Sequence, residues 1–164
     1  MATEIERRYL VSQEPWLRLG RPLVRHACTV RQGFLSTDKE RVVRVRVVED
    51  RAMLTIKGLT RGFTKQEFEY AIPLADARQM LDELCLQPLI EKRRYQIEQG
   101  GLLWEVDEFF GVNQGLLLAE VELTDAGQKV PLPPWVGREI SADPRYFNSS
   151  LSINPYSNWR DSTD

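Results

Sequence analysis

Alternation of charged and apolar residues, with a period of two, runs through most of this 164-residue chain. Segment 41–49 shows it most purely, because valines line one side while Arg44 and Arg46 lie on the other. A period of two belongs to β-strands, so each such segment has one apolar face and one charged face. The predicted strands are 4–10, 26–35, 41–49, 52–57, 65–72, 89–98, 102–110 and 116–123.

Short links join most of these strands, which favours antiparallel neighbours. Gly100-Gly101 separates two strands by two residues and is a strong hairpin signal. About eight strands with few helices predict a mainly β fold of the α+β type. We expect an eight-stranded antiparallel sheet closed into a barrel or tunnel, since closure removes exposed strand edges.

A few helices are expected outside the sheet. Apolar residues at helical spacing predict one over 74–86. Ser12 is expected to cap a shorter helix over 13–19, with Pro15 in its first turn. Asp143-Pro144 has the residue types of a cap and first position, which predicts a last short helix.

Composition indicates a soluble globular protein with a single domain. Hydrophobic residues make up 42% and charged residues 28% of the chain. We assign the domain to 1–156 and a polar tail to 157–164. The net charge of −2 argues against general nucleic-acid binding. No apolar run approaches the ~20 residues of a membrane span, so a cytoplasmic location is expected.

Metal ligands of the histidine and cysteine type are not indicated. Cys28 and Cys85 lie far apart, and neither has metal-ligand spacing to the single histidine, His26. We expect two buried, reduced thiols and give His26 no catalytic role.

The charged faces carry both signs, sorted by strand. The first and last strands are rich in acid, whereas 41–49 and 89–98 are basic. On one strand alone, such charges would simply mark the wet side of a sheet. If the apolar faces point outward, the charged faces line a tunnel, where like charges are costly without a partner. Such a tunnel predicts bound ligands of both charges, namely metal cations and a polyanion.

The residue types restrict the chemical identity of these ligands further. Carboxylates without histidine or cysteine favour hard cations such as Mg²⁺, Mn²⁺ or Ca²⁺. Arginine matches phosphate oxygens with two hydrogen bonds, and lysine offers a point charge. The chain has no P-loop or dinucleotide fingerprint. We therefore expect the first and last strands to hold metal, and the strands between them to bind a polyphosphate.

Several motifs, in order along nearly the whole chain, resemble the triphosphate tunnel metalloenzymes, also called CYTH proteins. Glu4-Ile5-Glu6-Arg7-Arg8 is similar to their ExExK signature. The other similar segments are 43–46, 54–58, 67–70, 91–95, 104–107 and 119–123. Segments 135–137 and 146–148 are like the end of small bacterial members.

The resemblance implies an eight-stranded tunnel that hydrolyses the terminal phosphate of inorganic triphosphate or a related triphosphate, with metal-activated water as the nucleophile. It implies one or two Mg²⁺ or Mn²⁺ ions held by Glu4, Glu6, Glu120 and Glu122. The implied phosphate ligands are Arg8, Arg44, Arg46, Lys57, Lys65, Lys92 and Arg94. Catalytic roles are implied for Glu4, Glu6, Arg8 and Asp107.

Two positions depart from the family pattern, and two other functions stay open. Arg8 stands where the signature has lysine, and Lys65 stands where many relatives have arginine.

The alternative functions are a class IV-type adenylyl cyclase that makes cyclic AMP from ATP, and a non-catalytic binder of polyphosphate or nucleotide. The expected partner is a small-molecule polyphosphate, and a homodimer is compatible with the sequence.

Overall fold

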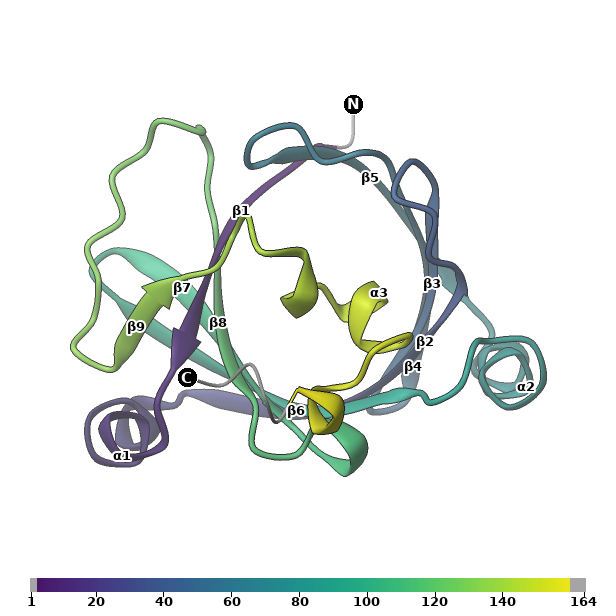
Figure 1. The fold of residues 1–164 in the computed structure, drawn as a ribbon, viewed down its shortest axis with the longest axis horizontal. Coiled ribbons are helices and arrows are strands. Elements are labelled where there is room, and N and C mark those ends of the chain that lie inside the picture. The colour runs from purple at the N-terminus through teal and green to yellow at the C-terminus, as the bar shows by residue number, and fades with distance from the viewer. Residues whose placement is uncertain (1–2, 160–164) are drawn as a thin grey trace.

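The computed structural model describes residues 3–159, and its strands form one closed antiparallel barrel. The strands are β1 (Thr3–Val11), β2 (His26–Ser36), β3 (Val42–Val48), β4 (Arg51–Lys57), β5 (Thr64–Ile72), β6 (Ile90–Gln99), β7 (Leu102–Phe109), β8 (Leu117–Glu122) and β9 (Val136–Glu139). Eight of them follow the order β5-β4-β3-β2-β6-β7-β8-β1, and β5 pairs with β1 to close the ring (Figure 1). The predicted eight-stranded barrel is confirmed.

Strand β9 was not predicted, and it lies beside the closing strand. β1 pairs with β5 through Thr3–Ile5, and farther along it pairs with β9 through Tyr9 and Val11. β9 has four residues and follows a proline-rich connector, so it is too short to show an alternation of its own.

Short helices connect the strands. They are α1 (Gln13–Pro15), the π-helical η1 (Trp16–Gly20), the 3₁₀ η2 (Arg21–Leu23), α2 (Leu74–Glu83), η3 (Gly111–Asn113), η4 (Pro144–Tyr146), α3 (Asn148–Leu151) and η5 (Tyr156–Asn158). Among residues 3–159, no helix has the length and apolar character needed to cross a membrane.

Asp143 and Ser12 both occupy the predicted cap positions, but of the two only Asp143 makes a capping hydrogen bond through its side chain. The Asp143 side chain accepts a hydrogen bond from the backbone N–H of Arg145 at 3.1 Å. Ser12 makes no such side-chain bond. A capping hydroxyl accepts from the second or third N–H of the helix, and the third position here is Pro15, which has none.

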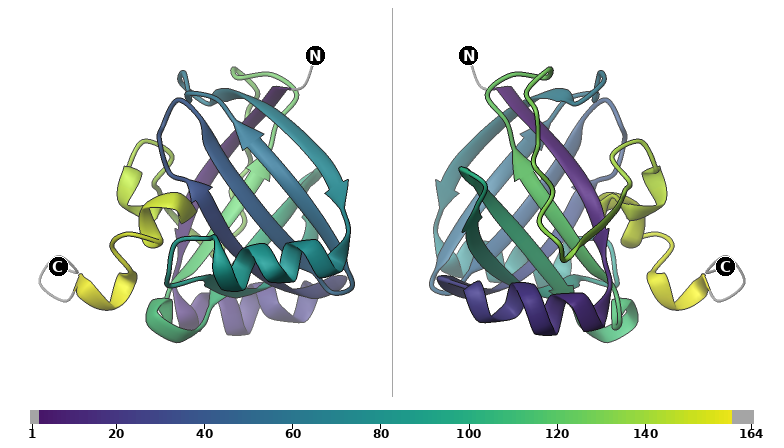
Figure 2. Two further views of the ribbon diagram at one scale, coloured as in Figure 1. Left: turned by 90° about the vertical axis from the view of Figure 1, so that its right-hand side faces the viewer. Right: turned by 90° about the vertical axis from the view of Figure 1, so that its left-hand side faces the viewer.

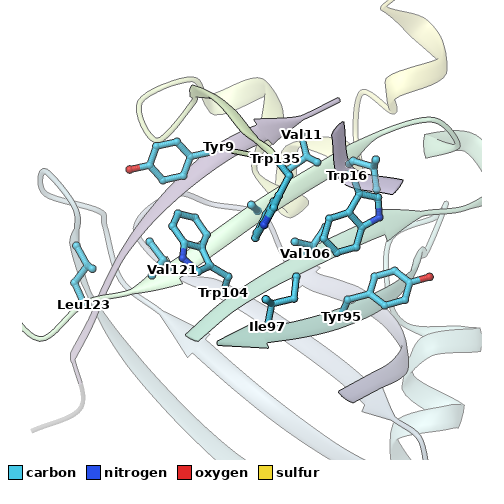
Figure 3. Packing of buried hydrophobic residues seen from close by; sticks show 12 residues of the cluster. Tyr9, Val11, Trp16, Tyr95, Ile97, Trp104, Val106, Val121, Leu123 and Trp135 are labelled. Carbon is cyan, nitrogen blue, oxygen red and sulfur yellow. The ribbon is translucent and has the colours of Figure 1, made fainter. Parts of the chain in front are cut away.

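Aromatic packing on the outer wall turns the apolar strand faces away from the barrel interior. Figure 3 shows Tyr9, Trp104 and their neighbours packed in one cluster with Trp16 of η1 and with Trp135, which directly precedes β9. The ring centroids of Trp104 and Trp135 lie 5.7 Å apart, and those of Trp16 and Trp135 lie 5.3 Å apart. Buried aromatic pairs of this kind contribute strongly to stability. With the apolar faces outward, the charged faces are left to line the inside.

Helix α2 covers a second patch of the outer wall. Its Ala77 and Leu81 pack on Val45 and Val47 of β3, together with Cys85. Cys28 and Cys85 are both buried and free, as predicted. Figures 1 and 2 show α1 and α2 against the outside of the barrel.

The C-terminal segment that follows β9 lies over one end of the barrel (Figures 1 and 2). Tyr146, Leu151 and Trp159 belong to one buried cluster with Phe34 and Ile90 of the barrel strands. Of the predicted polar tail, 157–159 belongs to this packed segment, since Trp159 is 5% exposed. Residues 160–164 of that tail lie outside the described residues.

Candidate active site

A cavity of about 530 Å³ collects the inward-facing charged side chains. Every residue predicted to bind metal or phosphate lines it. The lining carboxylates are Glu4, Glu6, Glu67, Glu69, Glu105, Glu120 and Glu122. The lining cations are Arg8, Lys39, Arg44, Arg46, Lys57, Lys65, Lys92 and Arg94. The charged interior predicted from the alternation is therefore present.

Strand register decides which charges face each other. Across β1 and β8, Glu6 lies opposite Glu122, and Arg8 lies opposite Glu120. Directly opposed side chains on one face have Cβ atoms about 4.5–5.5 Å apart. The Arg8 guanidinium accordingly donates to Glu120 at 3.0 Å. The next pair, Glu6 and Glu122, joins two like charges instead.

Carboxylates crowd the end of the cavity formed by the start of β1 and the end of β8. Burial, then Glu120 and Glu4, raises the pKa of Glu6. Burial, then Glu4 and Glu67, raises the pKa of Glu122. A shifted pKa of this sign means that the environment opposes the negative charge of these groups.

Two lysines offset part of that negative charge. The Lys65 ammonium lies 3.3 Å from carboxylate oxygens of both Glu4 and Glu6. The Lys57 ammonium lies 3.4 Å from Glu4 and 3.2 Å from Glu67. Glu6 and Glu4 raise the pKa of Lys65 against the effect of burial. Acidic and basic groups thus alternate around this end of the cavity.

The donor set fits a hard divalent cation. Within residues 3–159, no three acidic, histidine or cysteine side chains lie close enough together to form a ready metal cage. Mg²⁺ usually binds to one or two protein carboxylates and keeps waters and substrate phosphates as its other ligands. The paired Glu6 and Glu122, whose charges repel each other, match that requirement.

A cluster of cations lies along β3 and β6. Burial, then Arg44 and Arg94, lowers the pKa of Arg46 to about 9. Burial lowers the pKa of Lys92 to about 7, in spite of Asp107, and Arg94 adds to the shift. The lowered values show that burial and like charges oppose the positive charge of these groups. A polyanion would relieve this repulsion.

Asp107 lies beside these cations and is 1% exposed. Its carboxylate accepts from Arg94 at 2.8 and 2.9 Å and lies 2.8 Å from the Lys92 ammonium. Burial opposes its ionisation, but Arg94 and Lys92 lower the pKa of Asp107 to about 2. The structure therefore ties Asp107 to two predicted phosphate ligands, whereas the predicted metal ligands face the cavity.

Several residues of the site were not predicted. Gln32 from β2 is fully buried beside Arg46, and Asn148, Phe147 and Ser141 reach the cavity from the C-terminal segment. Their signal in the sequence is weak. Gln32 is one of several polar residues in β2, and the C-terminal residues follow no strand pattern.

The fold and the site together define a class: a closed antiparallel barrel whose interior carries both carboxylates and cations, with two like-charged carboxylates facing each other across adjacent strands. A family model described as the CYTH domain matches residues 2–152. The chain belongs to the CYTH domain family.

Relatives cover the chain almost completely. A protein of Acetivibrio thermocellus named inorganic triphosphatase is 44% identical over 161 residues, which are 98% of this chain and 100% of the relative. One of Nitrosomonas europaea with the same name is 35% identical, over 93% and 98% of the two chains.

Solved structures agree with the fold. The crystal structure of an inorganic triphosphatase matches with a TM-score of 0.63 and 34% identity, over 93% of this chain and 96% of that one. A protein of Pyrococcus horikoshii, at 18% identity, is similar in fold alone, with a TM-score of 0.58 over 75% and 80% of the chains.

Proposed function

We propose that this protein is a metal-dependent inorganic triphosphatase, which uses water to cleave the terminal phosphate of triphosphate. One observation carries the proposal: carboxylates of β1 and β8 share a single cavity with a cluster of buried arginines and lysines. Hydrolysis of a polyphosphate needs little covalent chemistry from the protein, so positioning and charge stabilisation account for most of its catalysis. The names of the two relatives support the same activity.

The cations would bind and orient the phosphates. Arg44 and Arg46 from β3 and Arg94 from β6 line the cavity with guanidiniums, a group that matches phosphate oxygens with paired hydrogen bonds. Lys57 of β4, Lys65 of β5 and Lys92 of β6 add point charges. The proposed phosphate ligands are Arg8, Arg44, Arg46, Lys57, Lys65, Lys92 and Arg94. Together they would absorb the charge that spreads over the equatorial oxygens in the transition state.

The carboxylates would hold one or two Mg²⁺ or Mn²⁺ ions. We propose Glu4, Glu6, Glu120 and Glu122 as the ligands. When bound, the metal would lower the pKa of an attacking water and neutralise charge on the phosphates.

Arg8 and Asp107 would act as supporting groups. Burial would raise the pKa of Glu120, but Arg8 first, then Arg94, holds it well below its usual range. Arg8 thereby keeps a proposed metal ligand ionised. Asp107 would orient Arg94 and Lys92 toward substrate through the contacts that it makes with both.

A phosphate-release panel tests the function. The purified protein is given triphosphate, pyrophosphate, ATP or thiamine triphosphate, each with Mg²⁺, with Mn²⁺ and with chelator. We expect phosphate release from triphosphate that needs added metal. Cyclic nucleotide and pyrophosphate from ATP would instead indicate a cyclase, and tight triphosphate binding without turnover would indicate a binding protein.

The variant Glu120→Ala tests the assignment of the ligands. It removes a carboxylate that faces both Arg8 and Arg94. We expect metal-dependent phosphate release to be abolished while the circular dichroism spectrum stays that of a folded β protein. Unchanged release would refute the assignment of Glu120.

A further inference from the structure

One carboxamide oxygen of the C-terminal segment contacts two barrel strands at once. Asn148 is the first residue of α3, which lies over the end of the barrel (Figure 1). Its side-chain oxygen accepts hydrogen bonds from Lys92 Nζ at 3.0 Å and from Gln32 Nε2 at 2.8 Å. Lys92 is on β6 and Gln32 is on β2, which are neighbouring strands. The segment thus supplies one neutral acceptor to donors from both strands.

Gln32 extends this contact to a second cation. Its side-chain oxygen accepts from Arg46 Nε at 2.7 Å, while its Nε2 donates to Asn148. The amide of Gln32 is fully buried, so each of its two ends has one fixed partner. A reversed amide would place N–H groups against the guanidinium of Arg46. The hydrogen bonds therefore run in one direction, from Arg46 through Gln32 to Asn148.

We propose that Asn148 and Gln32 are positioning residues, which hold the Lys92 ammonium and the Arg46 guanidinium in the orientation that receives the phosphates. This inference rests on the proposed binding of a polyphosphate in the cavity. Neither residue needs to touch substrate in order to act.

Neutral acceptors suit this task better than carboxylates. A carboxylate orients a cation but also neutralises it, as Asp107 does on the other side of Lys92. A carboxamide oxygen fixes the direction of the N–H groups and leaves the full positive charge for the substrate. Lys92 thus has one charged and one neutral partner, and the Arg46 Nε has a neutral one.

Apolar packing holds Asn148 in place. Tyr146 and Leu151, on either side of it in sequence, belong to the buried cluster that includes Ile90, two residues before Lys92. The same contact that closes the end of the barrel therefore sets the position of the amide. Rigid support of this kind is what a binding group needs in order to stay in productive geometry.

Two variants separate positioning from packing. Asn148→Ala removes the acceptor, and Gln32→Met keeps the side-chain volume but removes both hydrogen bonds. Hydrogen bonds to charged groups are strong, so we expect each variant to raise KM for triphosphate and Kd for metal-free triphosphate by about tenfold. The fall in kcat should be several-fold smaller than the rise in KM.

The double variant shows whether the two residues act through one another. If they do, Asn148→Ala with Gln32→Met should raise KM little more than the worse single variant does. Asn148→Asp keeps the size and the acceptor but adds a charge, so it should raise KM at least as much as Asn148→Ala. The added charge opposes a polyanion by itself, so this variant reports on charge beside Lys92, and Gln32→Met is the variant that separates positioning from packing.

Asn158→Ala is the matched control, because Asn158 lies in the same segment and its side chain donates to Asn154 at the surface. It should change KM and Kd by less than about twofold. Unchanged KM and Kd in folded Asn148→Ala, or strictly additive effects in the double variant, would overturn the inference. If the alanine variant does not fold, Gln32→Met decides: unchanged KM and Kd in that variant would overturn the inference. Wild-type protein that binds but does not turn over triphosphate would contradict only the proposed function.

Discussion

Glu6 of β1 and Glu122 of β8 are direct cross-strand partners, and both line the cavity. They come from opposite ends of the chain and join two negative charges. The next inward pair along the same strands, Arg8 and Glu120, joins opposite charges. The two strands therefore change along their length from a stabilising pair to a repelling one, and the repelling pair marks the proposed metal end of the site.

Neutralising Glu6 should stabilise the metal-free protein and impair its activity. The raised pKa of Glu6 shows that its surroundings oppose its negative charge, chiefly through burial and then Glu120 and Glu4. Without metal, we expect Glu6→Gln to raise Tm by a few degrees, which corresponds to about 1 kcal/mol or less in the free energy of unfolding. The variant should also lose most metal-dependent turnover. Differential scanning fluorimetry with and without Mg²⁺ gives the comparison. Added Mg²⁺ should stabilise the wild type more than the variant.

Glu98→Gln is the control for that measurement. Glu98 is largely exposed and pairs with Arg25 on the surface, so its loss should change neither Tm nor the response to Mg²⁺. A Glu6→Gln variant that is less stable than wild type and still fully responsive to Mg²⁺ would contradict the interpretation of the crowded carboxylates.

Replacing Arg8 tests whether charge or shape matters at this position. The Arg8 guanidinium is buried against Glu120 at 3.0 Å, so Arg8→Met should leave that carboxylate poorly compensated. We expect Arg8→Met to lower kcat/KM by at least ~100-fold, and Arg8→Lys, which keeps the charge, to stay within ~5-fold of wild type. Steady-state kinetics on triphosphate measure both. Equal losses in the two variants would show that the guanidinium geometry is required.

Asp107→Asn should destabilise the protein strongly, because it leaves Lys92 and Arg94 with reduced compensation. Breaking a buried ion pair from one side costs about 3–5 kcal/mol. The pKa of Asp107 falls from an ordinary value of 3.8 to about 2 in the fold. A depressed carboxyl pKa stabilises the fold above the ordinary value, and that contribution is lost as the pH falls from about 4 to about 2.

Urea unfolding between pH 7 and pH 2.5 tests this prediction. The free energy of unfolding should fall more steeply below pH 4 for the wild type than for Asp107→Asn. Asp82→Asn is the control, since Asp82 forms an exposed pair with Arg31 and should cost less than about 1 kcal/mol. Equal small effects of the two variants would show that the Asp107 contacts contribute little to stability.

Triphosphate binding should take up a proton at Lys92 near neutral pH. Burial lowers the pKa of Lys92 to about 7, so part of the population is neutral above that pH. A bound polyanion favours the charged form and raises this pKa. Metal-free calorimetry at pH 7.5, in buffers of different ionisation enthalpy, should show more proton uptake for the wild type than for Lys92→Gln. The difference should vanish near pH 5.5, where Lys92 is already protonated.

Much of the barrel could be predicted from the sequence, because a β-strand places alternate residues on opposite faces whatever its partners are. Arg44 and Arg46 are a clear case: their spacing alone assigned them to the face opposite the valines, and both line the cavity. β9 could not be predicted in this way. Its four residues are held by pairing with Tyr9 and Val11, which are more than 120 positions earlier in the chain.

The site followed the same division. The spacing of Glu4, Glu6, Glu120 and Glu122 placed them correctly on inward faces, as the cavity lining shows. Nothing in the sequence near Gln32 or Asn148 indicates a contact with each other, since 116 residues separate them. Asp107 shares its alternation with Glu105, yet its carboxylate is engaged by two cations at depth.

By itself, then, the sequence determined which side of each strand carries charge, since that depends on local backbone geometry with a period of two. Only the tertiary structure decided which charges became neighbours, because neighbours depend on strand register, on the closure of β5 against β1, and on the C-terminal segment packed over the barrel. The like-charged pair of Glu6 and Glu122 and the amide of Asn148 between two strands both arise at that level.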